Sequence, residues 1–301
     1  MQPLLIVSYG APERQEDVVP FLNNLFVGKN VSAERFEAAV QKYERYAAKT
    51  GHYSPLNSEC RKLITGVRHN APNVPIYWGN LFWYPLLVDT VAEMARDGID
   101  RAVCFVTSAF DSPSGNLRYA DALEAARHAV GANAPFLEKL PLPFEHPLFI
   151  EAQADRIREL TYLVGTPAHI LFTAHSIPIA DASRCRYVEQ LQSACRMVIE
   201  KLGTPNPWDL VYQSRSGAAE HWLGPDIKER IRGLAAGQCR TVIVSPIGFF
   251  CENMETEYDL DIEVGKCCAE WGLSFYRAKA VGAMPLICRL LCEFVYPQQT
   301  E

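Results

Sequence analysis

The chain has 301 residues, of which 49% are hydrophobic and 21% are charged, and its formal net charge is −6. This composition is typical of a globular protein, and the length suits one large domain or two medium ones. The negative charge argues against non-specific nucleic-acid binding. No apolar stretch reaches the roughly 18 residues of a membrane-spanning helix, and the N-terminal residues lack the basic start of a secretory signal.

Strands and helices are predicted to alternate along the chain. Short apolar runs that end in small or polar residues indicate buried parallel strands. These runs lie at residues 3–10, 74–80, 101–110, 169–178, 209–217 and 240–250. Helical patterns at 89–98, with Gly98 as the expected C-cap, and at 227–237 each precede a strand. This alternation predicts right-handed βαβ units and parallel sheets.

The first three predicted strands resemble the last three in the same order. LLIVSYGAP resembles HILFTAHSIP, VPIYWGN resembles DLVYQSRSG, and GIDRAVCFVTSAF resembles GQCRTVIVSPIGFF. We therefore predict an α/β fold of two similar doubly wound, Rossmann-like halves with parallel sheets. The boundary is expected near residue 150, which gives an N-terminal half (1–150) and a C-terminal half (151–301).

The ten cysteines do not form a recognisable framework. They include no CxxC pair, which argues against a zinc ribbon or a thioredoxin-type site. Several lie in apolar runs, as Cys104 does, and are expected to pack as small buried hydrophobic residues. Without a secretory signal, reduced thiols in the cytoplasm are the expectation.

His175 and Glu255 are the first candidates for chemistry. Ligands of open parallel sheets bind beyond the carboxyl ends of the strands. His175 ends the fourth predicted strand and Glu255 begins the segment after the sixth, so both are expected to face one cleft. An imidazole can accept a proton near neutral pH or bind a borderline metal. A buried, hydrogen-bonded histidine is the alternative.

An acidic row follows the last of these strands. Six carboxylates fall within the twelve residues 252–263. Glu255, Asp259 and Glu263 are spaced i, i+4, i+8, so they share one face if the segment is helical, at a repulsion of about a few tenths of a kcal/mol per pair. One interpretation is a solvated helix face. The other is a path for cations or protons, because such a row concentrates cations and can share protons.

Motifs along nearly the whole chain resemble those of the ferrochelatases, particularly the soluble bacterial type. The ordered matches are SYGAP (8–12), YSPLN (53–57), YWGN followed by FVTSA, TAHSIP (173–178), YQSRSG with WLGPD (212–226), and GFFCENMET (248–256). The resemblance implies a chelatase-type fold of two halves with a porphyrin cleft between them. It also implies an enzyme that inserts Fe²⁺ into a porphyrin with loss of two pyrrole protons, a step of heme biosynthesis.

The resemblance implies roles for individual residues as well. His175 and Glu255 match the catalytic pair, expected to face each other across a slot wide enough for a tetrapyrrole. Together with Asp259 and Glu263, they match groups that handle the metal or the protons. The expected porphyrin-binding residues are Tyr9, Ser54, Tyr119 and Lys29.

Substrate and partners follow from the same resemblance. Coproporphyrin III is the expected porphyrin and protoporphyrin IX the close alternative, with Fe²⁺ as a substrate and no tightly bound cofactor. Asn116 stands where some relatives have a cluster cysteine, so no [2Fe–2S] cluster is expected, and Glu252-Asn253 replaces the family's Asp-His. We expect a cytoplasmic monomer. A cobalt or nickel chelatase of the same fold and a non-catalytic tetrapyrrole-binding protein are the other classes left open.

Overall fold

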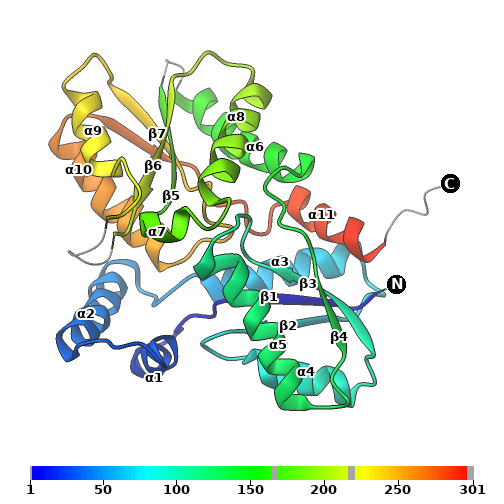
Figure 1. Cartoon of the computed structure of the whole chain (residues 1–301). Coiled ribbons are helices and arrows are strands. Elements are labelled where there is room, and N and C mark those ends of the chain that lie inside the picture. The colour runs from blue at the N-terminus through cyan, green and yellow to red at the C-terminus, as the bar shows by residue number, and fades with distance from the viewer. Residues whose placement is uncertain (1, 165–167, 216–220, 297–301) are drawn as a thin grey trace. The chain divides into compact units, whose positions relative to one another are not determined.

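The computed structural model describes residues 2–164, 168–215 and 221–296 (Figure 1). The chain divides into two compact units. Unit 1 comprises Met1–Thr107, Arg118–Leu140 and Leu291–Glu301, and unit 2 comprises Ser108–Leu117 and Pro141–Leu290. The chain therefore passes between the units more than once, which a single boundary near residue 150 does not describe.

Unit 1 is built on a four-stranded parallel sheet of order β2-β1-β3-β4. Its strands are β1 (Leu4–Ser8), β2 (Ile76–Asn80), β3 (Arg101–Val106) and β4 (Phe136–Lys139). The three predicted strands are confirmed, and β1 is buried along its whole length, as expected for an apolar run inside a parallel sheet. β4 was not predicted, because FLEK is short and half polar at the edge of the sheet.

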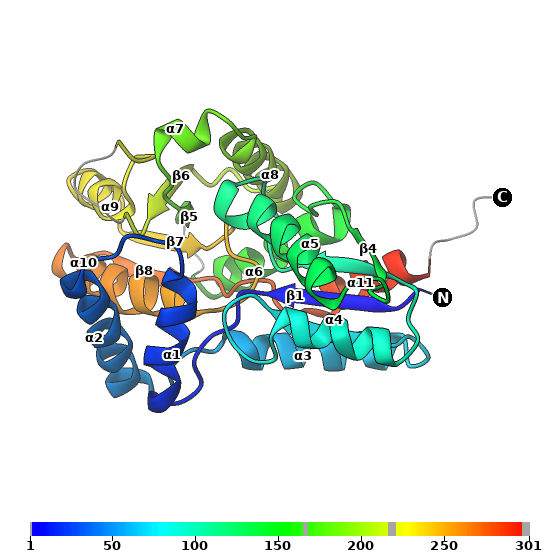
Figure 2. The same ribbon diagram turned by 60° about the horizontal axis from the view of Figure 1, so that its bottom comes forward.

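The described part of unit 1 contains helices that precede or follow its strands in the sequence. They are α1 (Gln15–Phe26), α2 (Ala33–Thr50), α3 (Leu56–Asn70), α4 (Leu87–Arg96), α5 (Arg118–Val130) and α11 (Pro285–Val295), the last of which continues from unit 2. Helices α4 and α5 pack against each other, as right-handed crossovers to β3 and β4 require. Helices α1 and α2 lie side by side (Figure 2). The helix predicted at 89–98 is confirmed as α4, and Gly98 follows its end with a left-handed φ of +72°.

Unit 2 repeats this strand order as β6-β5-β7-β8, again all parallel. Its strands are β5 (His169–His175), β6 (Trp208–Gln213), β7 (Thr241–Ser245) and β8 (Ser274–Arg277). When strands are counted within each unit, both sheets have the order 2-1-3-4. The repeat seen in the sequence is therefore confirmed, and only the edge strand β8 was missed.

The helices of unit 2 cover the sheet around a buried core. They are α6 (Pro147–Val164), α7 (Ile179–Ala182), α8 (Tyr187–Leu202), α9 (Ile227–Ala235) and α10 (Gly265–Glu270). Helix α9 begins where the carboxylate of Asp226 accepts hydrogen bonds from two backbone N–H groups, as an N-cap does. Leu171 of β5, Ile231 of α9 and Cys268 of α10 are fully buried in one hydrophobic cluster.

The acidic segment after β7 is helical, as predicted, but it is a π-helix (Thr256–Val264) that continues directly into α10. A second, shorter π-helix spans Pro113–Leu117. π-helices are rare and occur frequently at functional sites. The unusual helix type at the acidic row therefore directs attention to this end of the unit 2 sheet.

Most of the ten cysteines are buried. Their sulfur atoms form no disulfide among the described residues. Burial raises the pKa of Cys104 and of Cys268 to about 12, so both thiols stay protonated and unreactive near neutral pH. In the described part of the chain, no helix has the length and apolar character needed to cross a lipid bilayer.

Candidate active site

His175 is the last residue of β5, at the carboxyl end of the unit 2 sheet. Its Nδ1 lies 2.5 Å from the carbonyl oxygen of Ser176. Because a carbonyl oxygen only accepts hydrogen bonds, we infer that Nδ1 carries the proton and donates it. Nε2 then keeps its lone pair, and it lies 3.7 Å from Oε1 of Glu255. A nitrogen held in this way can accept a proton or bind a metal ion.

Two hydrogen bonds fix the backbone around His175. The hydroxyl of Tyr187 donates a hydrogen bond to the carbonyl oxygen of His175 (3.1 Å), and the hydroxyl of Ser176 donates to the carbonyl oxygen of Leu223 (2.8 Å). Burial raises the pKa of Tyr187 well above its ordinary value, so the phenol remains a donor. These bonds fix the end of β5 and the direction of the imidazole.

Gly248 allows the loop after β7 to cross β5 beside His175. Its N–H donates to the carbonyl oxygen of Thr173 (3.1 Å). A Cβ atom at this position would lie 2.4 Å from Cβ of Ala174, far inside van der Waals contact. The glycine of the GFFCENMET motif is therefore required by a close backbone approach, and this approach brings the acidic segment next to the histidine.

The distance between His175 and Glu255 corrects one expectation. A flat ring needs roughly 3.5 Å to the atoms on each of its faces, or about 7 Å in all. The two side chains are only 3.7 Å apart, so no macrocycle fits between them. The predicted slot between His175 and Glu255 is therefore wrong.

Asn253 starts the helical segment that carries Glu255. Its Oδ1 accepts hydrogen bonds from the backbone N–H of Glu255 (2.8 Å) and of Thr256 (3.0 Å), which is how an N-cap side chain acts. This places Glu255 in the first turn, close to the end of β5. The asparagine that departs from the family motif thus has a structural role in this chain.

Asp259 is nearly buried, with 7% of its surface exposed, and the hydroxyl of Ser214 donates a short hydrogen bond to its carboxylate. Ser214 follows β6 and has a φ of +61°, a left-handed conformation that is uncommon outside glycine and concentrates at functional sites. The side-chain amide of Gln213 lies 3.5 Å from the carbonyl oxygen of Glu255. The end of β6 therefore helps to position the acidic row.

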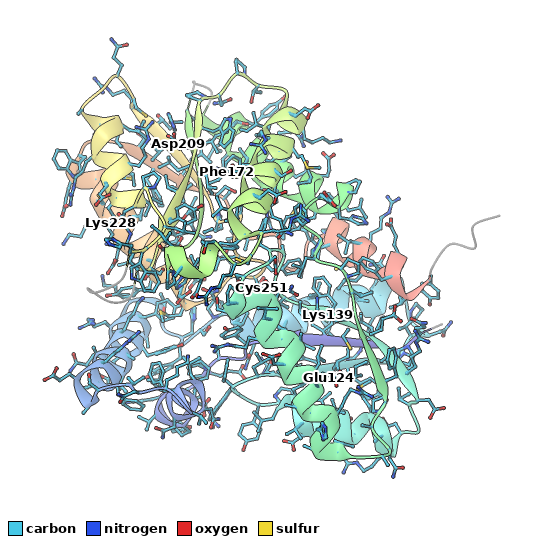
Figure 3. The ribbon with its side chains drawn as sticks, in the orientation of Figure 1. Glu124, Lys139, Phe172, Asp209, Lys228 and Cys251 are labelled. Atoms are coloured by element: carbon cyan, nitrogen blue, oxygen red, sulfur yellow. The ribbon has the colours of Figure 1, made fainter. Side chains whose placement is uncertain are left out.

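The protein's own cations offset part of the repulsion in the acidic row. Arg277 contacts Glu252 (2.7 Å) and Asp261 (2.9 Å), and Lys228 of α9, marked in Figure 3, contacts Glu263 (2.6 Å). Glu252, Asp261 and Glu263 thus each have a basic partner. The sequence did not reveal these partners, although the lack of any Lys or Arg within 252–263 signals that cations must come from elsewhere.

Two members of the row lie at the carboxyl ends of β5 and β6. Glu255 lies beside His175, and Asp259 beside Ser214. Within the described residues, no group of three or more His, Cys, Asp or Glu is arranged as a metal-binding cluster. His175 and Glu255 supply two potential ligands, fewer than the four typical of a structural zinc site.

Unit 1 presents an aromatic group at the carboxyl end of β1. The ring of Tyr9 lies 5.1 Å from that of Phe82 and meets the ring of Tyr119 edge-on at 5.8 Å. Tyr119 is 2% exposed, and its hydroxyl lies 3.2 Å from Oγ1 of Thr107. Tyr119 thus supports Tyr9, which is the more exposed of the two rings.

Three of the matched motifs meet at this end of β1. Gly10 has a φ of +74°, and a Cβ there would approach Cβ of Asn80 to 2.8 Å. The buried amide of Asn57 donates to the carbonyl oxygen of Ala11 (3.1 Å). Ser54 is buried too, and its hydroxyl accepts a hydrogen bond from the backbone N–H two residues later, at the start of α3. SYGAP, YWGN and YSPLN are therefore joined by packing and hydrogen bonds.

A cluster of cations, formed by Lys29, Arg35 and Arg118, also belongs to unit 1. Burial lowers the pKa of Lys29 from its ordinary value, and the charges of Arg118 and Arg35 lower it further. The guanidinium of Arg118 lies over the ring of Phe82, 5.8 Å from its centre. Within the described residues, none of the three cations forms an ion pair with a carboxylate. Lys29 was a candidate from the sequence, and neither of the two arginines was.

Comparisons with known proteins agree with the motifs. A family model described as ferrochelatase matches residues 2–299. A ferrochelatase from Rhodopirellula baltica is 40% identical, and the alignment covers 97% of this chain and 84% of the relative. A coproporphyrin III ferrochelatase from Frankia alni is 41% identical (97% and 78% covered), and one from Nocardia farcinica is 40% identical (98% and 87% covered).

Solved structures show the same architecture at low sequence identity. The sirohydrochlorin chelatase SirB from Bacillus subtilis subspecies spizizenii, in complex with cobalt, has a TM-score of 0.56 and 12% identity. That likeness covers 97% of this chain and 92% of SirB, and it shows a chelatase fold of two α/β halves. With a family model matched over almost its full length, this chain belongs to the ferrochelatase family of enzymes, which insert a metal into a porphyrin.

Proposed function

We propose that this chain inserts ferrous iron into coproporphyrin III in heme biosynthesis and releases the two pyrrole protons. The observation that carries the proposal is the position of His175, whose Nδ1 bonds to the carbonyl oxygen of Ser176 while its Nε2 lies 3.7 Å from the carboxylate of Glu255. Membership of the family supports porphyrin metallation. Relatives named coproporphyrin III ferrochelatase, about 40% identical over nearly the whole chain, support the choice of porphyrin.

His175 and Glu255 act on the same face of the porphyrin. A free-base porphyrin must lose its central N–H protons as the metal enters, and Nε2 of His175 is placed to accept one of them. The carboxylate of Glu255 stabilises the positive charge of the imidazolium or of the metal ion. Binding energy that domes the macrocycle exposes the nitrogen lone pairs to these groups.

Asp259 and Glu263 supply metal ions to His175 and Glu255 or carry protons away from them. Imidazole nitrogen and carboxylate oxygen both suit a borderline ion such as Fe²⁺. A site with few ligands holds its ion weakly, which suits an ion that leaves with the product. Lys228 occupies the outer end of the row at Glu263, in a pair that is about 40% exposed and thus adds little stability. An incoming ion can displace this ammonium group at small cost.

Neutralising the row is expected to weaken the use of metal. In the double variant Asp259→Asn with Glu263→Gln, we expect the KM for Fe²⁺ to rise about tenfold or more, because two carboxylates that attract the ion are lost. Porphyrin affinity should stay unchanged. Initial rates against Fe²⁺ concentration, with porphyrin fluorescence quenching, measure both. Glu270→Gln, an exposed carboxylate of α10, is the matched control, and an unchanged KM would make the row a solvated surface.

The cation cluster of Lys29, Arg35 and Arg118 favours a porphyrin with many carboxylates. Coproporphyrin III carries more propionates than protoporphyrin IX, and each propionate can accept charge-assisted hydrogen bonds from Lys or Arg. A bound carboxylate would raise the lowered pKa of Lys29.

Removing a cation of this cluster is expected to affect coproporphyrin III more than protoporphyrin IX. For Arg118→Gln we expect the affinity for coproporphyrin III to fall about five- to tenfold, a loss of roughly one charge-assisted hydrogen bond discounted for partial exposure. Lys62→Gln, an exposed unit 1 lysine paired with Glu59, should change neither affinity. Equal losses for the two porphyrins would argue against the assigned contact.

The function itself is tested by anaerobic insertion of Fe²⁺ with coproporphyrin III and protoporphyrin IX side by side, followed by absorbance. Faster metallation of coproporphyrin III is expected. A preference for Co²⁺ or Ni²⁺ would favour a different chelatase, and tight porphyrin binding without metallation would favour a binding protein. The cytoplasmic location, the monomeric state and the absence of a tightly bound cofactor stay predictions.

A further inference from the structure

A network of charges joins the acidic helix to the end of β8. Its centre is Arg277, the last residue of β8. Nη1 of Arg277 lies 2.7 Å from Oε1 of Glu252, and both side chains are only 7% exposed. Nη2 of the same guanidinium donates to Asp261 (2.9 Å), and its Nε also bonds to this carboxylate. One planar fork therefore joins a residue before the π-helix to a residue inside it.

Glu252 is fully occupied in this network. Its Oε1 also accepts a hydrogen bond from the backbone N–H of Ala280 (2.6 Å), and its Oε2 accepts one from the hydroxyl of Thr256 (2.8 Å). Burial alone would raise the pKa of Glu252, but Arg277 and these donors hold it below its ordinary value. Glu252 is thus a fixed anion rather than a group that exchanges protons with the substrate.

The two carboxylates bound by Arg277 bracket the functional part of the helix. Glu255 and Asp259 lie between them in the sequence. The contact of Glu255 with His175 depends on the rotation and the height of this helical segment. The guanidinium of Arg277 bonds a residue on each side of Glu255 and Asp259. It therefore fixes the rotation and the height of the segment, because bidentate Arg–carboxylate pairs have a defined geometry.

Stability gives little reason for such a network. A buried ion pair is often no more stabilising than apolar residues of the same volume. Its distinctive effect is directional: each bond sets where a carboxylate lies. Arg277 has this effect without touching the substrate-facing groups.

We propose that Arg277 is a positioning residue for porphyrin metallation, holding Glu252 and Asp261 so that Glu255 and Asp259 keep their places beside His175 and Ser214. This inference rests on the proposed function of the same site. It assigns Arg277 no contact with the porphyrin or the iron.

The test separates positioning from stability by comparing three variants. Arg277→Met removes the cation beside the buried carboxylate of Glu252 and the exposed carboxylate of Asp261, so this variant is expected to be less stable, mainly through Glu252. The triple variant Arg277→Met, Glu252→Gln, Asp261→Asn contains no unpaired buried charge, and its unfolding temperature should return close to that of the wild type. Arg277→Lys keeps the charge but loses the fork. Lys266→Met, an exposed residue of α10, is the matched control.

Three quantities are measured in each variant: kcat for Fe²⁺ insertion, the Kd of porphyrin, and amide hydrogen exchange of residues 253–264. We expect kcat of the triple variant to remain about 10- to 100-fold below the wild type, the cost of a small misplacement of catalytic groups. Its Kd for porphyrin should stay within about twofold, and residues 253–264 should exchange faster. The Arg277→Lys variant should lie between the wild type and the triple variant.

Recovery of kcat and of exchange protection together with stability in the triple variant would overturn the proposal, because the network would then be structural only. The exchange measurement does not depend on activity. If the wild type metallates no porphyrin, the proposed function fails. Unchanged exchange in residues 253–264 of the triple variant would independently reject the positioning role of Arg277.

Discussion

His175→Ala is expected to abolish porphyrin metallation and to leave unit 2 folded. The substitution removes Nε2, which we propose as the proton acceptor, and a missing general base typically costs about 10²- to 10⁴-fold in rate. The fold should survive because the imidazole is partly exposed at a strand end, and because the hydrogen bond from Tyr187 goes to the backbone of His175 rather than to its side chain.

His169 offers a matched control on the same strand. It begins β5, at the opposite end from His175, and its Nε2 lies 2.6 Å from Asp209, a residue labelled in Figure 3. His169→Ala removes an imidazole without approaching the proposed site, so kcat should be preserved even if stability falls. Single-turnover insertion rates, porphyrin binding and thermal unfolding are compared for both variants. Normal turnover in His175→Ala, with intact porphyrin binding, would refute the assigned role.

Three of the four strands of each sheet could be predicted from the sequence. A strand buried on both faces is a continuous apolar run, such as LLIVS at Leu4–Ser8, and the two sets of three strands matched each other in order. The edge strands Phe136–Lys139 and Ser274–Arg277 could not be recognised, because one or both faces are partly exposed and their sequences are mixed. The π-helical form of the acidic segment left no distinct pattern either.

The composition of the site was predictable, but its distances were not. The rule that ligands bind at the carboxyl ends of parallel strands brought His175 and Glu255 together. The separation of 3.7 Å instead of a wide slot depends on how closely the loop at Gly248 approaches β5. The ion pairs of Arg277 also depend on tertiary structure and could not be predicted, since Arg277 lies in an edge strand that the sequence did not reveal.

Gly248→Ala is expected to lower both stability and activity. The new Cβ would lie 2.4 Å from Cβ and 2.7 Å from Cα of Ala174. Neither atom can move away by a change of rotamer, so the loop must shift away from β5 and stretch its hydrogen bond to Thr173. Overpacking of this kind costs about 1–3 kcal/mol in the free energy of unfolding, which urea denaturation measures.

The same shift should reduce turnover by roughly 100-fold, because Gly248 leads directly into the segment that carries Glu255, and a displacement of about 1 Å has effects of that size. Gly233→Ala is the control: this helical glycine has no neighbour closer than 3.8 Å, so alanine should stabilise α9 by about 0.5–1 kcal/mol and leave turnover unchanged. Adding Ala174→Gly to Gly248→Ala removes the closest contact and should restore part of both losses. If the double variant is no better than Gly248→Ala, the close approach to β5 is not what places Glu255 beside His175.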